Sequence, residues 1–513
     1  MNRSAGAGVL LGVAALVTSC GVHRLERTLV TPAGASTLDR KSPFLKVHLK
    51  NGQLYVLGSW SVDSAQRVVA GNGDLLDWNR LVVASGTYRL PLDSVALFET
   101  NVVSQSRSAT ALTVMAGITA AAAGFCIASP KTCFGSCPTF YVPGPNGPLL
   151  QAEGFSASIA PGLEATDLDA LYRAAPKGRD FVVRMTNEAF ETHVVRSVNL
   201  VTVRRPTNGR VFVTKSGAFW QANGVTEPTA CQSSDGDCRE LVRRFDGIER
   251  VSAADSSDLG AKETVHLTFA PATGQRIGLV ITARQTLLTT YVLYQGLSYL
   301  GSGAGQFLAS LSNRRDSTLA QSGLLGKVLG GIEVLVPDSA GGWTPVGDVG
   351  ETGPLAADTK LVPIPGRGPG PLRIRLRMTR GLWRLDYVAL ASLAQELTPT
   401  RLTPARVVRG GQEDRDALAA LLDSTRVLTT LPGDEYELHF RLPPDPSGQE
   451  LFLEARGYYL EWMRQEWLAE ENPRLAANML LDPAGMLRAL APAYKRQEAI
   501  MEKVFWNSRY VRH

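Results

Sequence analysis

Alternating apolar and polar residues predict β-strands along most of this chain. In residues 44–60 leucine and valine alternate with lysine and histidine, and Asn51-Gly52 interrupts the alternation. A period of two residues is typical of a strand with one buried face. Asn-Gly favours a two-residue hairpin turn, because both central residues of that turn adopt positive φ. Further short strands follow, so residues 44–104 are predicted to form a small β domain.

The longer remainder repeats the strand pattern in neighbouring pairs of segments. We expect each pair to form a hairpin, because only a short connection separates its members. The pairs are residues 181–187 with 192–205, 372–378 with 383–389, and 435–443 with 450–462. The middle pair is the most regular: Arg373, Arg375 and Arg377 alternate with apolar residues, which predicts a solvated sheet face rather than an anion site. Residues 131–410 are predicted to form the main β-rich domain.

Two apolar segments interrupt the strands. They cover residues 105–130, which carry no charge from 108 to 128, and residues 285–311, which carry none. Both are rich in small residues and threonine, and the second contains Gly301-x-x-x-Gly305. Each is long enough to span a membrane as a helix, but small residues also allow helices to pack closely inside a protein. We expect two buried helices between β layers.

The last region, residues 411–513, begins with a β hairpin and continues with helical patterning. Four aromatic residues gather where the pattern changes, and they are candidates for binding a partner: Tyr458, Tyr459, Trp462 and Trp467. Tyr459, Met463 and Trp467 share one helical face, which favours packing instead. The predicted fold class is mainly β, with sandwich-type sheets, two buried apolar helices and a helical C-terminal region.

The N-terminus has the pattern of an export signal. One arginine precedes a short apolar stretch, and VTSC at 17–20 matches the lipobox of bacterial lipoproteins. We expect residues 1–19 to be a signal peptide and Cys20 to be acylated, with an ordinary secretory signal as the alternative. Several acyl chains form a durable anchor, because each buried methylene contributes about 0.8 kcal/mol. Residues 20–43 show no clear period and are predicted to be a tether, and Gly21 favours the outer membrane.

The net charge and the distribution of charged residues indicate which classes of partner the chain can bind. The 513 residues include 53 Lys and Arg and 48 Asp and Glu, a formal net charge of +5. These charges are interspersed rather than gathered into a basic block, so nucleic-acid binding has little support. The expected partners are the membrane, through the lipid, and another envelope protein.

The remaining five cysteines would lie in a compartment that permits disulfides. Cys126, Cys133 and Cys137 follow a C-x6-C-x3-C spacing, which lacks both the ligand pairs of structural zinc and the C-x-x-C of a redox centre. Cys231 and Cys238 flank an Asp-Gly turn and are predicted to pair with each other. Cys133 is expected to pair with Cys137 or with Cys126, and Cys126 is the expected odd one out.

No catalytic motif stands out in the sequence. The nucleophile elbow, the zinc-protease motif, the phosphate-binding loop and the dinucleotide fingerprint do not occur. Glu153, Glu164 and Asp167 are candidates for a carboxylate-dependent hydrolase. A solvated loop or a helix start rich in acids explains the same pattern. We therefore predict no catalytic residue, no metal ligand and no cofactor.

Several segments have unusually specific sequences. They are CFGSCPTFYV (133–142), EGFSASIAPGLEATDLDAL (153–171), MTNEAFETHVV (185–195), LKVHLKNGQLYVLGSW and TYVLYQGLSYLG. These segments resemble a family of uncharacterised lipoproteins of diderm bacteria, and the resemblance extends from about residue 28 onward. It implies placement in the envelope and brings no activity, cofactor or functional residue with it.

These observations predict a non-catalytic envelope lipoprotein, a β-rich binding or assembly module anchored to the outer membrane. One alternative is an exported hydrolase that acts on glycans or peptides through its carboxylates. Another is an accessory subunit of a secretion or transport complex that docks through the aromatic C-terminal region.

Overall fold

The computed structural model of this chain describes most residues beyond the N-terminus. The described residues are 23–42, 44–49, 53–76, 82–105, 137–145, 147–189, 191–207, 209–271, 276–304, 307, 328–350, 352–365, 370–431, 433–461 and 470–507. Contacts divide the chain into two units, Met1–Ala123 and Gly124–His513. The predicted signal peptide with Cys20, nearly all of the apolar segment 105–130, and Cys126, Cys133, Trp462 and Trp467 lie outside the described residues.

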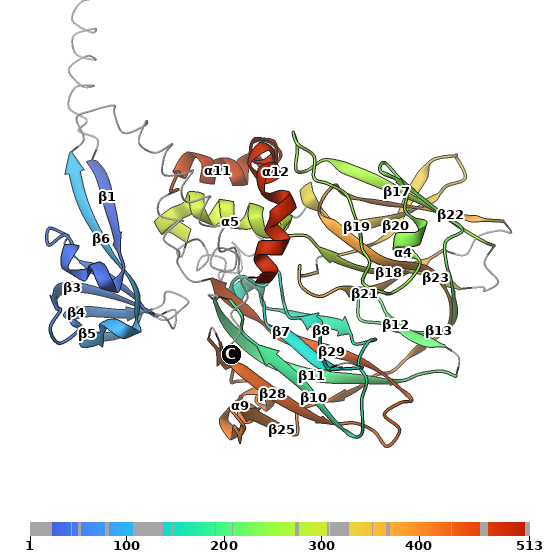
Figure 1. Ribbon diagram of the computed structural model, residues 1–513, viewed down its shortest axis with the longest axis horizontal. Coiled ribbons are helices and arrows are strands. Elements are labelled where there is room, and N and C mark those ends of the chain that lie inside the picture. Colours follow the sequence, from blue (N-terminus) through green and yellow to red (C-terminus); the bar gives the residue numbers. More distant parts are fainter. Residues whose placement is uncertain are drawn as a thin grey trace, which may run out of the picture. The chain divides into compact units, whose positions relative to one another are not determined.

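The first unit contains one six-stranded antiparallel sheet in the order β1-β6-β2-β3-β4-β5 (Figure 1). Its strands are β1 (His23–Val30), β2 (Leu45–Leu49), β3 (Leu54–Asp63), β4 (Val68–Leu76), β5 (Val82–Pro91) and β6 (Val95–Gln105), with a short 3-10 helix η2 (Leu92–Ser94) before β6. β2 to β5 pair in the order in which they occur in the chain. Leu45 lies opposite Leu57, which confirms the predicted pairing of β2 with β3. Phe98 and Val47 are fully buried beside them in the core of this unit.

The predicted tether at 20–43 is wrong for its described part. Residues His23–Val30 form β1, which pairs along its whole length with β6, and Pro32–Thr37 form a 3-10 helix, η1. Val30, Ala35 and Leu38 join the core of the first unit. The sequence conceals this strand because β1 lies at a sheet edge, where a strand needs only one partner and a weak apolar pattern is sufficient.

The second unit contains four antiparallel sheets, and the first two enclose one core. Sheet 1 has the order β26-β25-β28-β10-β7-β8, and sheet 2 has the order β24-β11-β29-β9, with β27 also pairing with β11. Sheet 1 consists of β7 (Thr139–Gly144), β8 (Gly147–Glu153), β10 (Asp180–Thr186), β25 (Arg406–Arg409), β26 (Gln412–Glu413) and β28 (Glu435–Arg441). Sheet 2 consists of β9 (Ala165–Ala170), β11 (Glu191–Arg204), β24 (Thr400–Leu402), β27 (Leu428–Thr430) and β29 (Gln449–Glu461), and η3 (Pro161–Leu163) precedes β9.

Inward-facing residues of both sheets form the core between them. Phe140, Phe181 and Phe440 of sheet 1 pack in one cluster with Leu200 and Leu453 of sheet 2, and all five are fully buried. Helix α9 (Arg415–Leu422) covers part of this core. Its N-cap Asp414 accepts a hydrogen bond from the Ala417 backbone N–H, which satisfies a donor that the first helical turn leaves open.

Sheets 3 and 4 enclose the second core of this unit. Sheet 3 has the order β12-β13-β23-β18-β21, with β16 also pairing with β23, and sheet 4 has the order β15-β14-β17-β22-β19-β20. Sheet 3 consists of β12 (Arg210–Val213), β13 (Phe219–Thr226), β16 (Arg250–Val251), β18 (Ile277–Gln285), β21 (Asp358–Ile364) and β23 (Trp383–Leu397). Sheet 4 consists of β14 (Ala230–Ser233), β15 (Gly236–Asp237), β17 (Lys262–Phe269), β19 (Ile332–Pro337), β20 (Trp343–Val349) and β22 (Leu372–Thr379), and the short helix α4 (Arg239–Val242) follows β15.

The alternation predicted for β22 is confirmed. Leu372, Ile374, Leu376 and Met378 are buried in the second core, whereas Arg373 and Arg377 are exposed. Arg375 stacks over the Trp343 ring at 3.9 Å, and Arg377 pairs with Glu333. The arginine row is therefore the outer face of sheet 4, engaged by its own neighbours.

The three predicted hairpins are wrong, although their strands are present. β10 and β28 belong to sheet 1 and their successors β11 and β29 to sheet 2, while β22 belongs to sheet 4 and β23 to sheet 3. Each connection therefore crosses from one sheet to another, which strand patterning cannot reveal. At the crossing between β22 and β23, Gly381 has φ +75°, and a Cβ there would lie 2.5 Å from the Ala254 backbone nitrogen. Only glycine fits this crossing without strain.

Three helices lie together beside the second core (Figure 1). They are α5 (Leu288–Leu300), which is followed by η4 (Gly301–Gly303), α11 (Pro473–Leu481) and α12 (Pro483–Asn507). The Tyr291 and Tyr494 rings of α5 and α12 have centroids 5.1 Å apart, and both side chains are buried. α5 supplies the buried helix that was predicted within 285–311. Among the described residues, no helix has the length and apolar character needed to cross a membrane.

The separate C-terminal region predicted at 411–513 is wrong for its β part. β26, β27, β28 and β29 complete sheets 1 and 2, whose other strands come mostly from residues 139–204. Among the described residues of this region, α11 and α12 form the predicted helical end. The cause is again long-range pairing: β29 pairs with β11 over nearly its whole length, from Glu461 opposite Glu191 to Gln449 opposite Arg204.

Candidate functional site

Two of the three predicted carboxylates lie in a buried group. We call this group the carboxylate cluster, and its members are Glu153, Asp167, Asp169, Asp358 and Lys360. The third, Glu164, lies near the surface, where Arg196 and Arg456 donate hydrogen bonds to it at 2.9 and 2.6 Å. Burial opposes these bonds, but together they lower the pKa of Glu164 below its usual value. Glu164 is therefore an ion-paired acid.

The carboxylate cluster ties β9, the end of β8 and β21 together. The Lys360 ammonium pairs with the Asp358 carboxylate and donates a hydrogen bond to the Leu168 carbonyl at 2.6 Å. The Glu153 carboxylate accepts a hydrogen bond from the Leu355 backbone N–H at 2.7 Å. The cluster thus connects three segments that are distant in sequence and belong to sheets 1, 2 and 3.

The Lys360 ammonium group interacts with three carboxyl groups of this cluster, those of Asp358, Asp169 and Asp167, and the pKa values respond. Burial, reinforced by the carboxylates of Asp358 and Asp167, raises the pKa of Asp169 well above its usual value. Burial also raises the pKa of Asp167 to about 6, and Lys360 offsets this only in part. One Asp169 oxygen has no hydrogen-bond partner among the described residues. Because the positive charge is insufficient, both acids bind protons at a higher pH than free aspartates do.

The cluster has pKa shifts of the kind found in active sites. None of its members lines either of the two hollows considered below. Within the part of the chain that the structure describes, no group of three or more His, Cys, Asp or Glu residues is arranged to hold a metal ion. Structural ion networks also perturb pKa values, and the enclosed position of this cluster fits that role. The hydrolase alternative stays a prediction.

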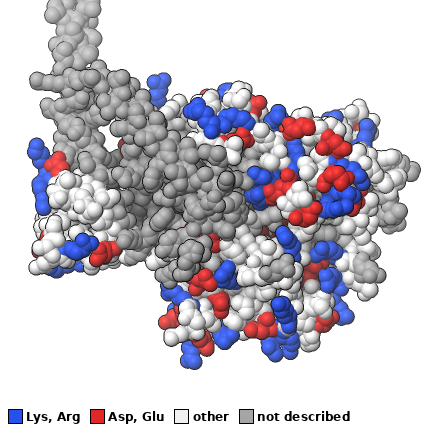
Figure 2. Space-filling model, in the orientation of Figure 1, with Lys and Arg blue, Asp and Glu red and all other residues white. Residues whose placement is uncertain are grey.

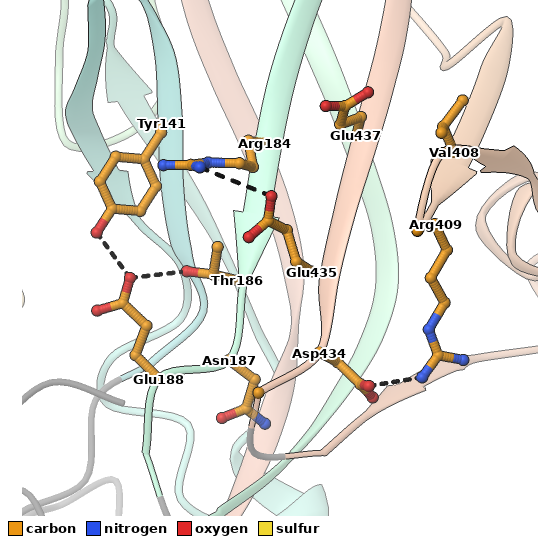
Figure 3. A pocket seen from close by; sticks show the side chains of 13 residues that line it. Tyr141, Arg184, Thr186, Asn187, Glu188, Val408, Arg409, Asp434, Glu435 and Glu437 are labelled. Carbon is orange, nitrogen blue, oxygen red and sulfur yellow. Dashed lines mark hydrogen bonds and ion pairs between the residues drawn. The ribbon is translucent and has the colours of Figure 1, made fainter. Parts of the chain in front are cut away.

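A hollow of about 610 Å³ lies on the outer face of sheet 1 (Figure 3). We call it the sheet 1 hollow. A row of side chains crosses four strands in register along it, from Val408 through Glu437 and Arg184 to Tyr141. These residues occupy the outward positions of their strands, whereas the alternate residues fill the first core. The same period-two pattern that builds the core therefore also lines the hollow.

Turns form the end wall of the hollow. Gly410 and Gly411 connect β25 to β26 with φ of +58° and +79°, and both residues line the hollow. Positive φ at both central residues is the requirement of the tight hairpin turn, which explains the Gly-Gly pair. A Cβ built at either glycine would meet no atom within 4 Å, so this wall has space for a side chain.

The polar groups of the hollow are held by mutual contacts. Tyr141 donates a hydrogen bond to the Glu188 carboxylate at 2.7 Å, and the Arg184 guanidinium lies 4.7 Å from the Tyr141 ring centroid. Figure 3 shows the Glu435 carboxylate directed towards Arg184, at 3.6 Å. At the other side of the hollow, Arg409 donates to the Asp434 carboxylate at 2.5 Å.

The sheet 1 hollow carries excess negative charge. Its charged side chains are those of two arginines and four acids, a formal net of −2: Arg184, Arg409, Glu188, Asp434, Glu435 and Glu437. Glu435 and Glu437 are about half exposed, at 52% and 49%. They remain in water and available to a ligand, unlike the acids of the carboxylate cluster.

A second, smaller hollow of about 360 Å³ lies beside β8. Glu249 in this hollow accepts two hydrogen bonds from Arg284, at 2.6 and 2.7 Å, so its charge is matched. Burial raises the pKa of Asp386 to about 6, although the Gly247 and Asp246 backbone N–H groups donate to its carboxylate. This hollow contains equal numbers of positive and negative side chains and offers less open charge than the sheet 1 hollow.

The cysteine predictions are confirmed where the structure describes both partners. Cys231 and Cys238 form a disulfide that closes the β14–β15 hairpin. Cys137 is buried in the first core. Its predicted partner Cys133 and the predicted odd residue Cys126 lie outside the described residues, so that pairing stays a prediction.

The aromatic candidates that the structure describes lie inside the second unit. Tyr458 and Tyr459 are buried in β29, and the Tyr459 hydroxyl donates a hydrogen bond to the Ser156 carbonyl at 3.1 Å. The helical face predicted to include Tyr459 is wrong at that residue, because it is a strand residue opposite His193 of β11. Trp462 and Trp467 lie outside the described residues, so the predicted aromatic docking surface stays untested.

Sequence reasoning missed both the sheet 1 hollow and two members of the carboxylate cluster. Lys360 and Asp358 lie about 190 residues from Leu168 and Ala170, to which they are hydrogen-bonded. No local pattern connects them. For the hollow, one signal was available: β28 reads E-Y-E-L-H-F-R, and its acids Glu435 and Glu437 occupy consecutive outward positions.

Comparisons with known proteins add no functional information. No protein-family model matches the chain, and no curated protein matches it. Among solved structures, a GH31 alpha-xylosidase from Xanthomonas citri is similar at 8% sequence identity and a TM-score of 0.14. That match covers 84% of this chain and 38% of the xylosidase chain. At this TM-score the likeness carries no argument about fold or function.

Proposed function

We propose that this protein is an envelope lipoprotein that binds a ligand or partner through the sheet 1 hollow and does not catalyse a reaction. The observation that supports this most strongly is the hollow itself. Its volume of about 610 Å³ lies within the range of small-ligand sites, roughly 300–1,000 Å³. It contains half-exposed charges on rigid strands, whereas the acids that could serve a hydrolase are buried or ion-paired.

The proposed anchor is a lipid on Cys20. The lipobox at 17–20 and the resemblance to diderm lipoproteins support it, and Gly21 favours the outer membrane. A Cys20→Ser chain should lose its partition into detergent and leave the membrane fraction. If that variant still fractionates with membranes, the anchor proposal fails, whatever the hollow binds.

Site-specific photo-crosslinking in cells tests the hollow. The full chain would carry a benzophenone amino acid at Val408 inside the hollow, or at Arg373 on the outer face of sheet 4 as the exposed control. We expect an adduct at position 408 that does not form at position 373. The nature of the adduct also separates a small ligand from a protein subunit of a larger complex.

A steric variant provides the matched test. Gly410→Asn retains a favourable turn, since Asn-Gly is the preferred pair for two residues of positive φ, and it adds a side chain to the wall of the hollow. The adduct at position 408 should decrease strongly in this background while the fold is kept. Equal adducts at both positions, or an adduct unaffected by Gly410→Asn, would reject the hollow as the binding site.

A further inference from the structure

We propose that the sheet 1 hollow binds an organic cation, an alkylammonium or guanidinium group on an apolar stem. This inference rests on the proposed binding function and specifies the class of ligand. It follows from the charge balance of the hollow, the placement of two acids and the apolar ends of the row that crosses the hollow.

The first argument is the position of two carboxylates. Glu435 and Glu437 alternate on β28, so their side chains project from the same face of sheet 1. Both are about half exposed, so a ligand can reach them from solvent. Arg184 is the cation directly across from Glu437 in the strand register, and it lies 3.6 Å from Glu435. Glu437 also lies 3.8 Å from the His439 ring. One guanidinium thus faces two carboxylates, and a cationic ligand would add positive charge beside them.

The second argument is that both arginines of the hollow are already engaged. Arg184 stacks against the Tyr141 ring and contacts Glu435, while Arg409 donates to Asp434 and lies over the Tyr436 ring at 5.2 Å. An anionic ligand would have to compete with these contacts and approach four carboxylates. A cation meets the excess negative charge directly, and electrostatic complementarity favours its approach.

The third argument is that the side chains at the two ends of the row offer apolar surface. Val408 and Tyr141 flank Glu437 and Arg184 in the row and present aliphatic and aromatic surface. Cations on hydrocarbon stems, such as lysine or arginine side chains and polyamines, place the stem on such surface and the charged end at the carboxylates. A hydrated metal ion would not use these ends, and the described residues contain no group arranged to bind one.

Calorimetric titration of the full-length protein at low salt tests the inference. The probes would be spermidine and a short lysine-containing peptide, each compared with its acetylated, uncharged counterpart. We expect saturable binding of a cationic probe, no binding of its acetylated form, and an affinity that decreases as salt is added. If only spermidine binds, the source of the cation is a free polyamine. If the peptide binds as well or better, the source is a side chain of a partner.

Variants assign the binding to the two acids. Glu437→Gln should weaken binding of the cationic probe about three- to fivefold, and the Glu435→Gln, Glu437→Gln double variant about tenfold or more. Asp348→Asn is the matched control, because Asp348 is an exposed acid paired with Lys215 on sheet 4, and its affinity should equal that of the wild type. Circular dichroism would verify that each variant is folded.

The experiments distinguish a failure of the cation inference from a failure of the proposed binding function. If no cationic probe binds at millimolar concentration, or if the double variant binds as well as the wild type, the cation inference is overturned. An adduct at position 408 that proves neutral or anionic also overturns it, while the proposed binding function survives. The absence of an adduct sensitive to Gly410→Asn overturns the proposed function itself.

Discussion

Two buried carboxylate sites, one in each unit, respond to burial in opposite ways. In the first unit, Glu99 is 2% exposed, and Lys46 and His48 contact its carboxylate at 2.8 and 3.3 Å. Burial alone would raise its pKa, but the hydrogen bonds and charges of His48 and Lys46 lower it to about 2. In the second unit, burial and neighbouring carboxylates raise the pKa of Asp167 to about 6.

The difference shows that the ratio of cations to carboxylates determines the direction of the shift. Glu99 contacts two basic neighbours, whereas three carboxyl groups interact with Lys360. Burial strengthens whichever interaction dominates, because charges interact more strongly in a medium of low dielectric constant. Glu99 should therefore lose its proton at a lower pH than a free glutamate, and Asp167 and Asp169 should lose theirs at a higher pH than a free aspartate.

Replacement of the shared lysine should have the largest effect. Lys360→Met should reduce the free energy of unfolding by about 3–5 kcal/mol, because removal of one partner leaves buried carboxylates uncompensated. The loss should be greater at pH 8 than at pH 5, since protons can neutralise the acids at the lower pH. Urea unfolding at both pH values measures it. Lys215→Met, which breaks an exposed pair with Asp348, should cost less than about 1 kcal/mol. Equal losses would show that the cluster is not a buried charge network.

Glu99→Gln tests the site with the lowered pKa. A fall from 4.5 to about 2 corresponds to about 3 kcal/mol of stability. This stability is fully present above pH 4.5 and is lost as the pH falls towards 2, so the variant and the wild type should converge in acid. Hydrogen exchange of β2 and β6 peptides reports the first unit locally. Asp93→Asn, at an exposed pair with Arg67, is the control and should change little. A constant difference across pH would contradict the linkage.

Asp167→Asn should increase the stability of the protein, whereas Glu99→Gln should decrease it. With a folded pKa of about 6 against 3.8 unfolded, the folded state binds more protons between these values, and wild-type stability decreases as the pH rises through this window. The variant lacks this decrease and should be more stable by up to about 3 kcal/mol at pH 8, with no gain at pH 4. Denaturant titrations of both proteins across this range provide the comparison, and Asp169→Asn should show the same sign. A loss of stability at pH 8 would mean that the acid is needed in its charged form.

Glu437→Gln should have the smallest effect on stability. The side chain is about half exposed, so water screens its charge, and we expect a change within about 0.5 kcal/mol at any pH between 5 and 8. Thermal unfolding would measure it. A larger loss would indicate that Glu437 stabilises sheet 1, and the hollow would then resemble the carboxylate cluster more than a ligand site.

Strand positions were predictable, and most strand partners in the second unit were not. The alternation in residues 372–378 identifies β22 and the residues that it buries, because side-chain direction depends only on the local period. The same pattern placed β10 beside β11 and β28 beside β29, yet these strands lie in different sheets. In the first unit β2 to β5 pair in chain order, so a local turn sufficed to predict the partner of β2.

The candidate sites also differ in whether local sequence could predict them. The Cys231–Cys238 disulfide spans only seven positions and follows from a local turn. Lys360 and Asp169 come from β21 and β9, and no sequence pattern near either residue indicates that the two lie close together. On the face of the second unit shown in Figure 2, basic and acidic side chains are interspersed, as the sequence predicted, so the distribution of charge did not reveal the hollow.

The amino-acid sequence by itself determined which segments are strands, which face of each strand is apolar, and where a short disulfide loop closes. These properties depend on neighbouring residues and on the two-residue period of an extended chain. Only the tertiary structure decided how consecutive strands are distributed between facing sheets, and therefore which charges meet. Burial with too few cations raises the pKa values of Asp167 and Asp169, while Glu435 and Glu437 lie about half exposed on the outer face of sheet 1, because the surroundings of each carboxyl group come from strands far apart in the chain.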